Sequence, residues 1–184
     1  MPLPALRVGD NELIVRMPFG KRVSLENLFL LGDFDVSVTG TKAELHAPSR
    51  QLAFGSVVHQ GLPFYGADVT YRIPFTLDQD ADIVITTHQY KAALLTAKLD
   101  GRDIGKIVYA PYRLEADGLS AGEHILELTA HLTRVNSFNA LHNCTQDKWI
   151  GPEFWYTEGC KWAYEYQLKD NGILKSPVIE VFEN

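Results

Sequence analysis

The sequence has 184 residues and 46% hydrophobic content, which is enough to bury one core in a single domain spanning residues 1–184. Its formal net charge is −6. The 17 Lys and Arg residues are scattered rather than clustered, which argues against nucleic acid as a partner. No apolar run approaches the roughly 18 residues that cross a bilayer, and the first residues lack the pattern of a signal peptide, so we expect no membrane partner.

The first part of the chain predicts two outer strands. Apolar residues alternate over 13–17 and again over 36–38, with the period of two that gives a strand one buried face. Between them, residues 23–31 form a compact apolar run without a decisive period, which is either a short helix or a buried strand. The alternating apolar residues are Leu13, Val15, Met17, Val36 and Val38.

The central part of the chain predicts further strands joined by tight turns. Apolar residues alternate over 69–75 and over 126–132. Between these segments, another alternating stretch leads into Asp100-Gly101, and Asp-Gly suits the left-handed dihedrals of a two-residue hairpin turn. Any function must therefore be carried by a β scaffold.

Residues 162–168 predict a late strand, because large apolar residues alternate there with polar or small ones. On this pattern Trp162 belongs to the core. A sandwich commonly joins its first and last strands in one sheet, so we expect the two termini to lie near each other.

Several segments carry a resemblance to a known family. After the strand at 71–75, residues 97–107 read AKLDGRDIGKI and residues 118–126 read GLSAGEHIL. They resemble the VxLDGxxIG hairpin and the GLxxGEHxLxL strand of the galactose-binding-like β-sandwich that accompanies bacterial glycoside hydrolases. The similarity is closest to the sugar-binding-type domain of family 2 and related hydrolases. Residues 60–66 and 149–155 also resemble the ends of such accessory domains.

The resemblance implies an all-β fold, a jelly-roll β-sandwich of galactose-binding-like type, in an accessory module of a larger bacterial hydrolase. Such a module would bind carbohydrate weakly or pack against the catalytic domain of its parent protein. The catalytic residues of family 2 hydrolases belong to a separate barrel domain that no segment here matches, so none is carried over. Two alternatives stay open: a purely structural β-sandwich module and a small stand-alone glycoside hydrolase. If the parent protein is exported, the module would be periplasmic or extracellular.

Aromatic residues near turns are the first candidates for a carbohydrate site, because indole and phenol faces suit the C–H faces of pyranose rings. Trp149 and Trp155 lie beside Gly151-Pro152, and they are equally well interpreted as loop platforms or as core residues. Tyr65 follows Gly61-Leu62-Pro63 and is either a rim residue or part of an apolar plug beneath a loop, which we favour.

Residues 134–143 concentrate hydrogen-bonding side chains directly after a strand. Arg134, Asn139 and His142 could bond sugar hydroxyls. The alternative, which we favour, is that this run satisfies backbone groups of a long and partly buried connection. His59 could assist binding, although a lone His at a strand end is more commonly a satisfied polar group.

This interpretation requires no cofactor. A calcium ion is common in related sandwiches, and Asp78, Asp80 and Asp82 at alternate positions are a weak suggestion of one, although a solvated turn is the favoured interpretation. Cys144 and Cys160 either form a disulfide or stay free, because the sequence does not place their Cα atoms within bonding distance. The acidic residues lie in no recognisable acid/base motif, so no catalytic residue is assigned.

Overall fold

The computed structural model describes residues 6–22, 28–49, 51–138, 141–145 and 158–183. The chain divides into two compact units, Met1–Gly32 and Asp33–Asn184. No helix in the described ranges is long and apolar enough to cross a membrane.

The N-terminal unit contains neither helix nor strand among its described residues, so the strand predicted over 13–17 is wrong. Leu13, Val15 and Met17 are 55%, 46% and 50% exposed. Alternating apolar residues become a strand only where a second strand pairs with their backbone, and no described segment pairs with this one. Of the ambiguous run over 23–31, residues 23–27 lie outside the described residues and the remainder is neither helix nor strand.

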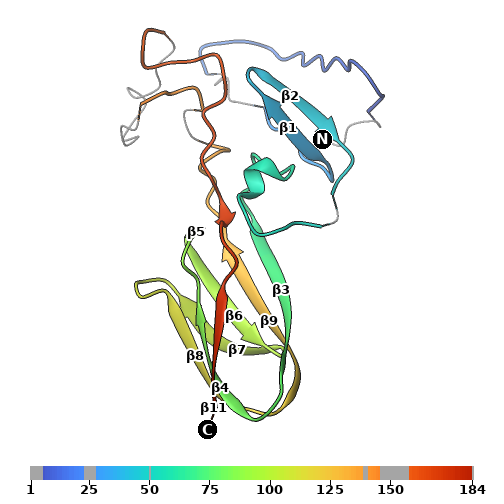
Figure 1. The fold of residues 1–184 in the computed structure, drawn as a ribbon. Helices are drawn as coiled ribbons and strands as arrows, with labels where there is room; N and C mark the ends of the chain where they lie inside the picture. Colours follow the sequence, from blue (N-terminus) through green and yellow to red (C-terminus); the bar gives the residue numbers. More distant parts are fainter. Residues whose placement is uncertain (1–5, 23–27, 50, 139–140, 146–157, 184) are drawn as a thin grey trace. The chain divides into compact units, whose positions relative to one another are not determined.

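The larger sheet of the second unit has four antiparallel strands in the order β3-β9-β6-β7 (Figure 1). β3 (Asp68–Leu77) pairs along its whole length with β9 (Gly122–His131). β6 (Leu94–Leu99) pairs with β9 on one side and with β7 (Arg102–Ile107) on the other. The strands predicted around 69–75 and 126–132 are confirmed.

The second sheet has three antiparallel strands in the order β11-β4-β8. These strands are β4 (Ala81–Thr86), β8 (Arg113–Leu119) and β11 (Val178–Glu183). Buried apolar side chains of both sheets belong to one core. The unit is therefore an all-β β-sandwich, which confirms the predicted fold class.

Short elements complete the unit. β1 (Asp35–Thr39) and β2 (Lys42–His46) form a hairpin, which confirms the strand predicted at 36–38. β5 (Tyr90–Lys91) pairs with β10 (Gly172–Ile173), and η1 (Val57–His59) is a single 3-10 turn.

The expectation that the first and last strands share a sheet is wrong. Among the described strands, β1 pairs only with β2, whereas β11 pairs with β4. A hairpin is formed locally by residues close in sequence, and β1 thus gains its backbone partner without joining the sandwich.

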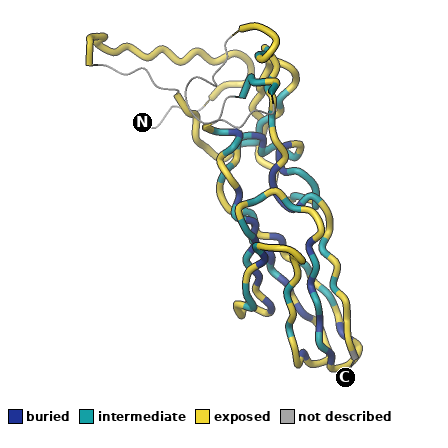
Figure 2. Tube along the Cα trace, turned by 90° about the vertical axis from the view of Figure 1, so that its left-hand side faces the viewer, coloured by how far each residue is buried: buried dark blue, intermediate teal, exposed yellow. Residues whose placement is uncertain are grey.

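Apolar side chains of both sheets form the buried core. Ile83 and Ile85 on β4, and Leu126 and Leu128 on β9, are 0% exposed. Figure 2 shows buried and exposed residues alternating along the sandwich strands, as the period of two requires. Burying each such side chain contributes about 1.5–3 kcal/mol before the cost of ordering the chain.

The strand predicted over 162–168 is also wrong. Only Trp162 makes a β-bridge there, with Asn143. The backbone N–H of Ala163 donates to His142, whereas that of Tyr166 donates to Gly40, so the segment hydrogen-bonds to different partners in turn rather than along one ladder. Trp162 is accordingly half-buried and lies outside the core.

The two sequence motifs of the resemblance meet in space. Asp100 and Gly101 both have positive φ, 50° and 80°, as the predicted two-residue hairpin turn requires. The Asp100 carboxylate accepts hydrogen bonds from His124 Nδ1 (2.7 Å) and from the Ile125 N–H (2.9 Å). His124 Nε2 donates to the Ser120 carbonyl (2.8 Å), so both ring nitrogens are engaged. These contacts therefore tie the turn between β6 and β7 to β9.

Candidate functional site

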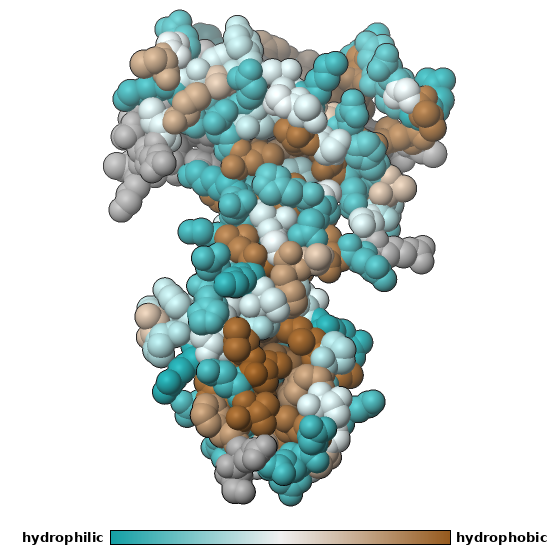
Figure 3. Space-filling model, in the orientation of Figure 1, coloured by the Kyte–Doolittle hydropathy of each residue, from teal (hydrophilic) through white to brown (hydrophobic). Residues whose placement is uncertain are grey.

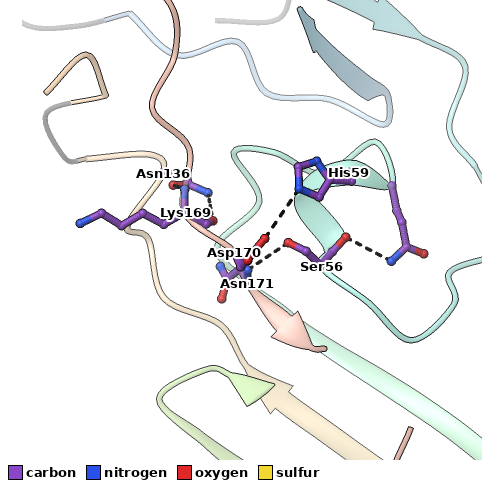
Figure 4. Close-up of polar contacts among 7 residues, drawn as sticks. Ser56, His59, Asn136, Lys169, Asp170 and Asn171 are labelled. Atoms are coloured by element: carbon purple, nitrogen blue, oxygen red, sulfur yellow. Dashed lines mark hydrogen bonds and ion pairs between the residues drawn. The ribbon is translucent and has the colours of Figure 1, made fainter. Parts of the chain in front are cut away.

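Asn136, in the polar run after β9, hydrogen-bonds to the backbone. Asn136 is 2% exposed, and its side chain donates to the Lys169 carbonyl (2.8 Å) while accepting the Lys169 N–H (2.9 Å). The side-chain amide thus satisfies both the N–H and the carbonyl of one backbone residue, as a neighbouring strand would do in a sheet. Figure 4 shows Asn136 facing Lys169, with Asn171 and Ser56 beside them. Asn171 is equally buried, and it donates to the Thr133 carbonyl (3.1 Å).

Tyr65 and Arg134, two of the predicted ligand residues, belong to chain segments that touch each other. Gly66 lies directly against Arg134, since a Cβ on Gly66 would be 2.7 Å from Arg134 Cγ. The Arg134 guanidinium lies 5.8 Å from the centre of the Phe138 ring, which is within the range of a cation–π contact. Tyr65 is 39% exposed, and its hydroxyl donates to the Asp68 carbonyl (3.3 Å). Both side chains therefore already have partners within the chain.

His142, the third predicted ligand residue, lies in a row of aromatic rings. His142 is 5.0 Å from the Tyr166 ring and 5.7 Å from the Trp162 ring, measured between centroids. The row continues from Trp162 to Tyr164 (4.5 Å) and from Tyr166 to Phe64 (5.6 Å). Tyr164 is 73% exposed. We call these five residues the aromatic row.

The other predicted ligand residues, Asn139, Trp149 and Trp155, lie outside the described residues. Their neighbours along the chain are described at both sides. The N–H of Cys144 donates to the Lys161 carbonyl (2.9 Å), next to the bridge between Asn143 and Trp162. These contacts join the described residues on either side of 146–157 to each other next to the aromatic row.

A pocket of about 570 Å³ adjoins the aromatic row at Tyr166. Its walls come from the β1–β2 hairpin, from the η1 region and from residues 165–168. The lining residues are Asp35, Val36, Ser37, Val38, Gly40, His46, Val58, His59, Gly61, Glu165, Tyr166 and Leu168. This volume lies within the usual range for small-ligand sites.

The polar side chains of this pocket are partly held in place. The Asp35 carboxylate accepts the Ser49 N–H (2.7 Å) and packs so tightly on Gly61 that a Cβ there would lie 2.5 Å from Oδ2. The Ser37 hydroxyl lies 2.7 Å from His46 Nε2. His59 Nε2 lies 3.7 Å from the Asp170 carboxylate (Figure 4).

Sequence analysis missed most of this pocket. His59 was considered, whereas Asp35, His46, Glu165 and Tyr166 were not singled out. They come from segments more than a hundred positions apart, and no local motif marks them. Only the packing of the hairpin against residues 165–168 brings them together.

Two of the three aspartates suggested for calcium hydrogen-bond to the backbone. The Asp80 carboxylate accepts the Ala121 N–H (2.8 Å), and the Asp82 carboxylate accepts the Gly118 N–H (2.7 Å). Within the described ranges, no three His, Cys, Asp or Glu residues form a group that could hold a metal ion. Cys144 and Cys160 are free and exposed.

Comparison with known proteins gives a likeness of fold. No family model matches the chain, and no curated protein matches it. A rhamnosidase from Novosphingobium sp. PP1Y aligns over 88% of this chain and 16% of its own, with 17% identity and a TM-score of 0.51.

Two further solved structures align more weakly. A GH2 β-galacturonidase from Eisenbergiella tayi, bound to galacturonate, aligns over 82% of this chain and 23% of its own, with 18% identity and a TM-score of 0.42. A β-D-glucuronidase from Dictyoglomus thermophilum aligns over 82% and 27%, with 15% identity and a TM-score of 0.39. The chain spans well under a third of each of these chains, and it shares its fold with a part of the rhamnosidase.

Proposed function

We propose that this chain is a non-catalytic accessory module of a bacterial glycoside hydrolase, a galactose-binding-like sandwich that binds carbohydrate or packs against the catalytic domain. The observation that carries the proposal is the fold shared with a rhamnosidase, in which the matching part is 16% of the chain. A sandwich of this kind thus occurs as a minor part of a larger glycosidase. The sequence motifs of the sugar-binding-type domain support the same role.

The roles of the acidic residues favour a non-catalytic module. A glycosidase needs two carboxyl groups about 5–10 Å apart, one of them in surroundings that keep it protonated. Asp80, Asp82 and Asp100 each accept backbone N–H groups and so serve the fold. The pocket carboxyls are no better suited, because Asp35 accepts a backbone N–H and Glu165 is exposed.

Carbohydrate binding is supported by the aromatic row. Tyr164 is exposed and contacts Trp162, which in turn contacts His142, so the row combines apolar ring faces with hydrogen-bonding groups. We place Trp149 and Trp155 as stacking platforms, with Arg134, Asn139, His142 and Tyr65 as hydrogen-bonding partners. One stacked ring contributes about 1–2 kcal/mol, so a site built from one or two binds near the millimolar range.

Packing against a catalytic domain is supported by the apolar edge of the sandwich. Among the described strands β11 lies at the edge of its sheet, and Val178, Val181 and Phe182 are 41%, 49% and 52% exposed. Figure 3 shows apolar side chains gathered on the face of the sandwich where β11 runs in Figure 1. Apolar areas of this kind commonly mark protein interfaces.

A glycan array followed by chemical-shift titration tests carbohydrate binding. Wild-type chain should bind at least one glycan near the millimolar range, and Trp155→Ala or Trp149→Ala should weaken that binding about fivefold or more. Tyr109→Ala is the matched control, because Tyr109 is 84% exposed and lies between β7 and β8.

Three outcomes separate the alternatives. Binding that survives both Trp substitutions would move the site elsewhere. If the folded chain binds no glycan, the remaining alternatives are a module that packs against the catalytic domain and a purely structural module. Hydrolysis of an aryl glycoside that is abolished by a single Asp or Glu substitution would instead establish a stand-alone hydrolase.

A further inference from the structure

The pocket beside Tyr166 has a polar wall that is set before any ligand arrives. Asp35 is fixed by the Ser49 N–H and by its close contact with Gly61, so its position depends on a residue without a side chain. Ser37 and His46 are joined to each other at 2.7 Å. Fixed groups lose little entropy when a ligand binds, which favours recognition of a small molecule.

Other lining residues give the pocket an aromatic and apolar surface. The Tyr166 ring is held edge-on to Phe64 at 65° and tilted to His142 at 38°. Its backbone N–H donates to the Gly40 carbonyl (3.2 Å), which ties this residue to the hairpin. Val58 and Leu168 add apolar area. A lining that combines an aromatic ring with carboxylate, hydroxyl and imidazole groups suits a ligand with an apolar face and hydroxyl edges.

The charges of the lining residues restrict the ligand further. Asp35 and Glu165 line the pocket, and its lining contains neither Lys nor Arg. Carboxylates are acceptors only, so they are satisfied by hydroxyl or ammonium donors. A carboxylate on the ligand would be repelled at short range.

From this arrangement we infer that the pocket is a second carbohydrate subsite, which takes a pyranose bearing hydroxyl or amino groups and rejects uronic acids. The inference rests on the proposed carbohydrate-binding function but assigns different residues from the Trp149 and Trp155 platform. Glu165 and Asp35 accept ligand hydroxyl or ammonium groups, and Tyr166 contacts the ring.

Amide chemical-shift titration of the whole chain at neutral pH tests the subsite. The probes are methyl galactoside, methyl rhamnoside, glucosamine and galacturonate. We expect the first three to shift the amides of Ser37, Gly40 and Gly61, and galacturonate to bind about tenfold more weakly. Glu165→Lys should narrow or reverse that preference for uncharged over uronic sugars, whereas Glu123→Lys at an exposed position of β9 should leave it unchanged.

Each result supports or overturns the subsite. Equal affinity for galacturonate and methyl galactoside, or indifference to Glu165→Lys, overturns it. Binding that shifts no pocket amide and disappears in Trp149→Ala and Trp155→Ala also overturns it, while leaving the proposed function intact. If the folded wild-type chain binds none of the probes or array glycans, both the subsite and the proposed carbohydrate-binding role are overturned.

Discussion

Replacing Asp100 by Asn tests the contact between the β6–β7 turn and His124. Asn tolerates the left-handed conformation at this position (φ 50°) and keeps an oxygen for the Ile125 N–H, so the change removes the charge and the oxygen that accepts from His124 Nδ1. A hydrogen bond to a charged group contributes about 1.5–3 kcal/mol. Because the Asp100 side chain is 47% exposed, we expect the substitution to cost about 1–2 kcal/mol of unfolding free energy.

The loss of unfolding free energy caused by Asp100→Asn should depend on pH. The hydrogen bond to Asp100, followed by that to the Ser120 carbonyl, raises the pKa of His124, and the same contact with His124 lowers the pKa of Asp100. Stability from His124 is complete below its unfolded pKa of about 6.5 and is lost as pH rises through the folded value. Stability from Asp100 is present above about pH 3.9 and is lost as pH falls through its folded pKa. The contact is therefore strongest between these two limits.

Urea unfolding of wild type and Asp100→Asn at about pH 5.5 and about pH 8.5 measures this difference. A double-mutant cycle with His124→Gln isolates the pair. Asp117→Asn on β8 is the control, because its carboxylate is exposed and outside this contact. A cost as large at the higher pH as at the lower one, or simple additivity with His124→Gln, would refute the reasoning.

Two further predictions concern the connection after β9 and the thiols. Asn136→Ala should lower the unfolding free energy by about 2–4 kcal/mol, because it leaves the N–H and the carbonyl of Lys169 without their buried partner; a change below about 0.5 kcal/mol in urea unfolding would contradict this. Cys144 and Cys160 should both react with a thiol reagent in the native chain, and a titration that finds no free thiol would show a disulfide instead.

The sequence alone determined the sandwich strands that rely on local signals. The alternation along β3 and β9 sets which face is buried, and the Asp100-Gly101 dipeptide sets the hairpin between β6 and β7. Each of these signals is contained in a short stretch of sequence. The paired strands β3 and β9 both show the same apolar alternation. The same alternation failed over 13–17 and 162–168, because a period of two does not specify whether another strand will supply hydrogen bonds.

Tertiary structure decided what the polar and aromatic residues do. It turned Asn136 inward to pair with the backbone of Lys169, and it joined Asp100 to His124 across the two motifs. It also created the pocket, whose walls come from the β1–β2 hairpin, η1 and residues 165–168. Contacts between segments so far apart depend on how the whole chain packs, and no spacing of residues along the sequence encodes them.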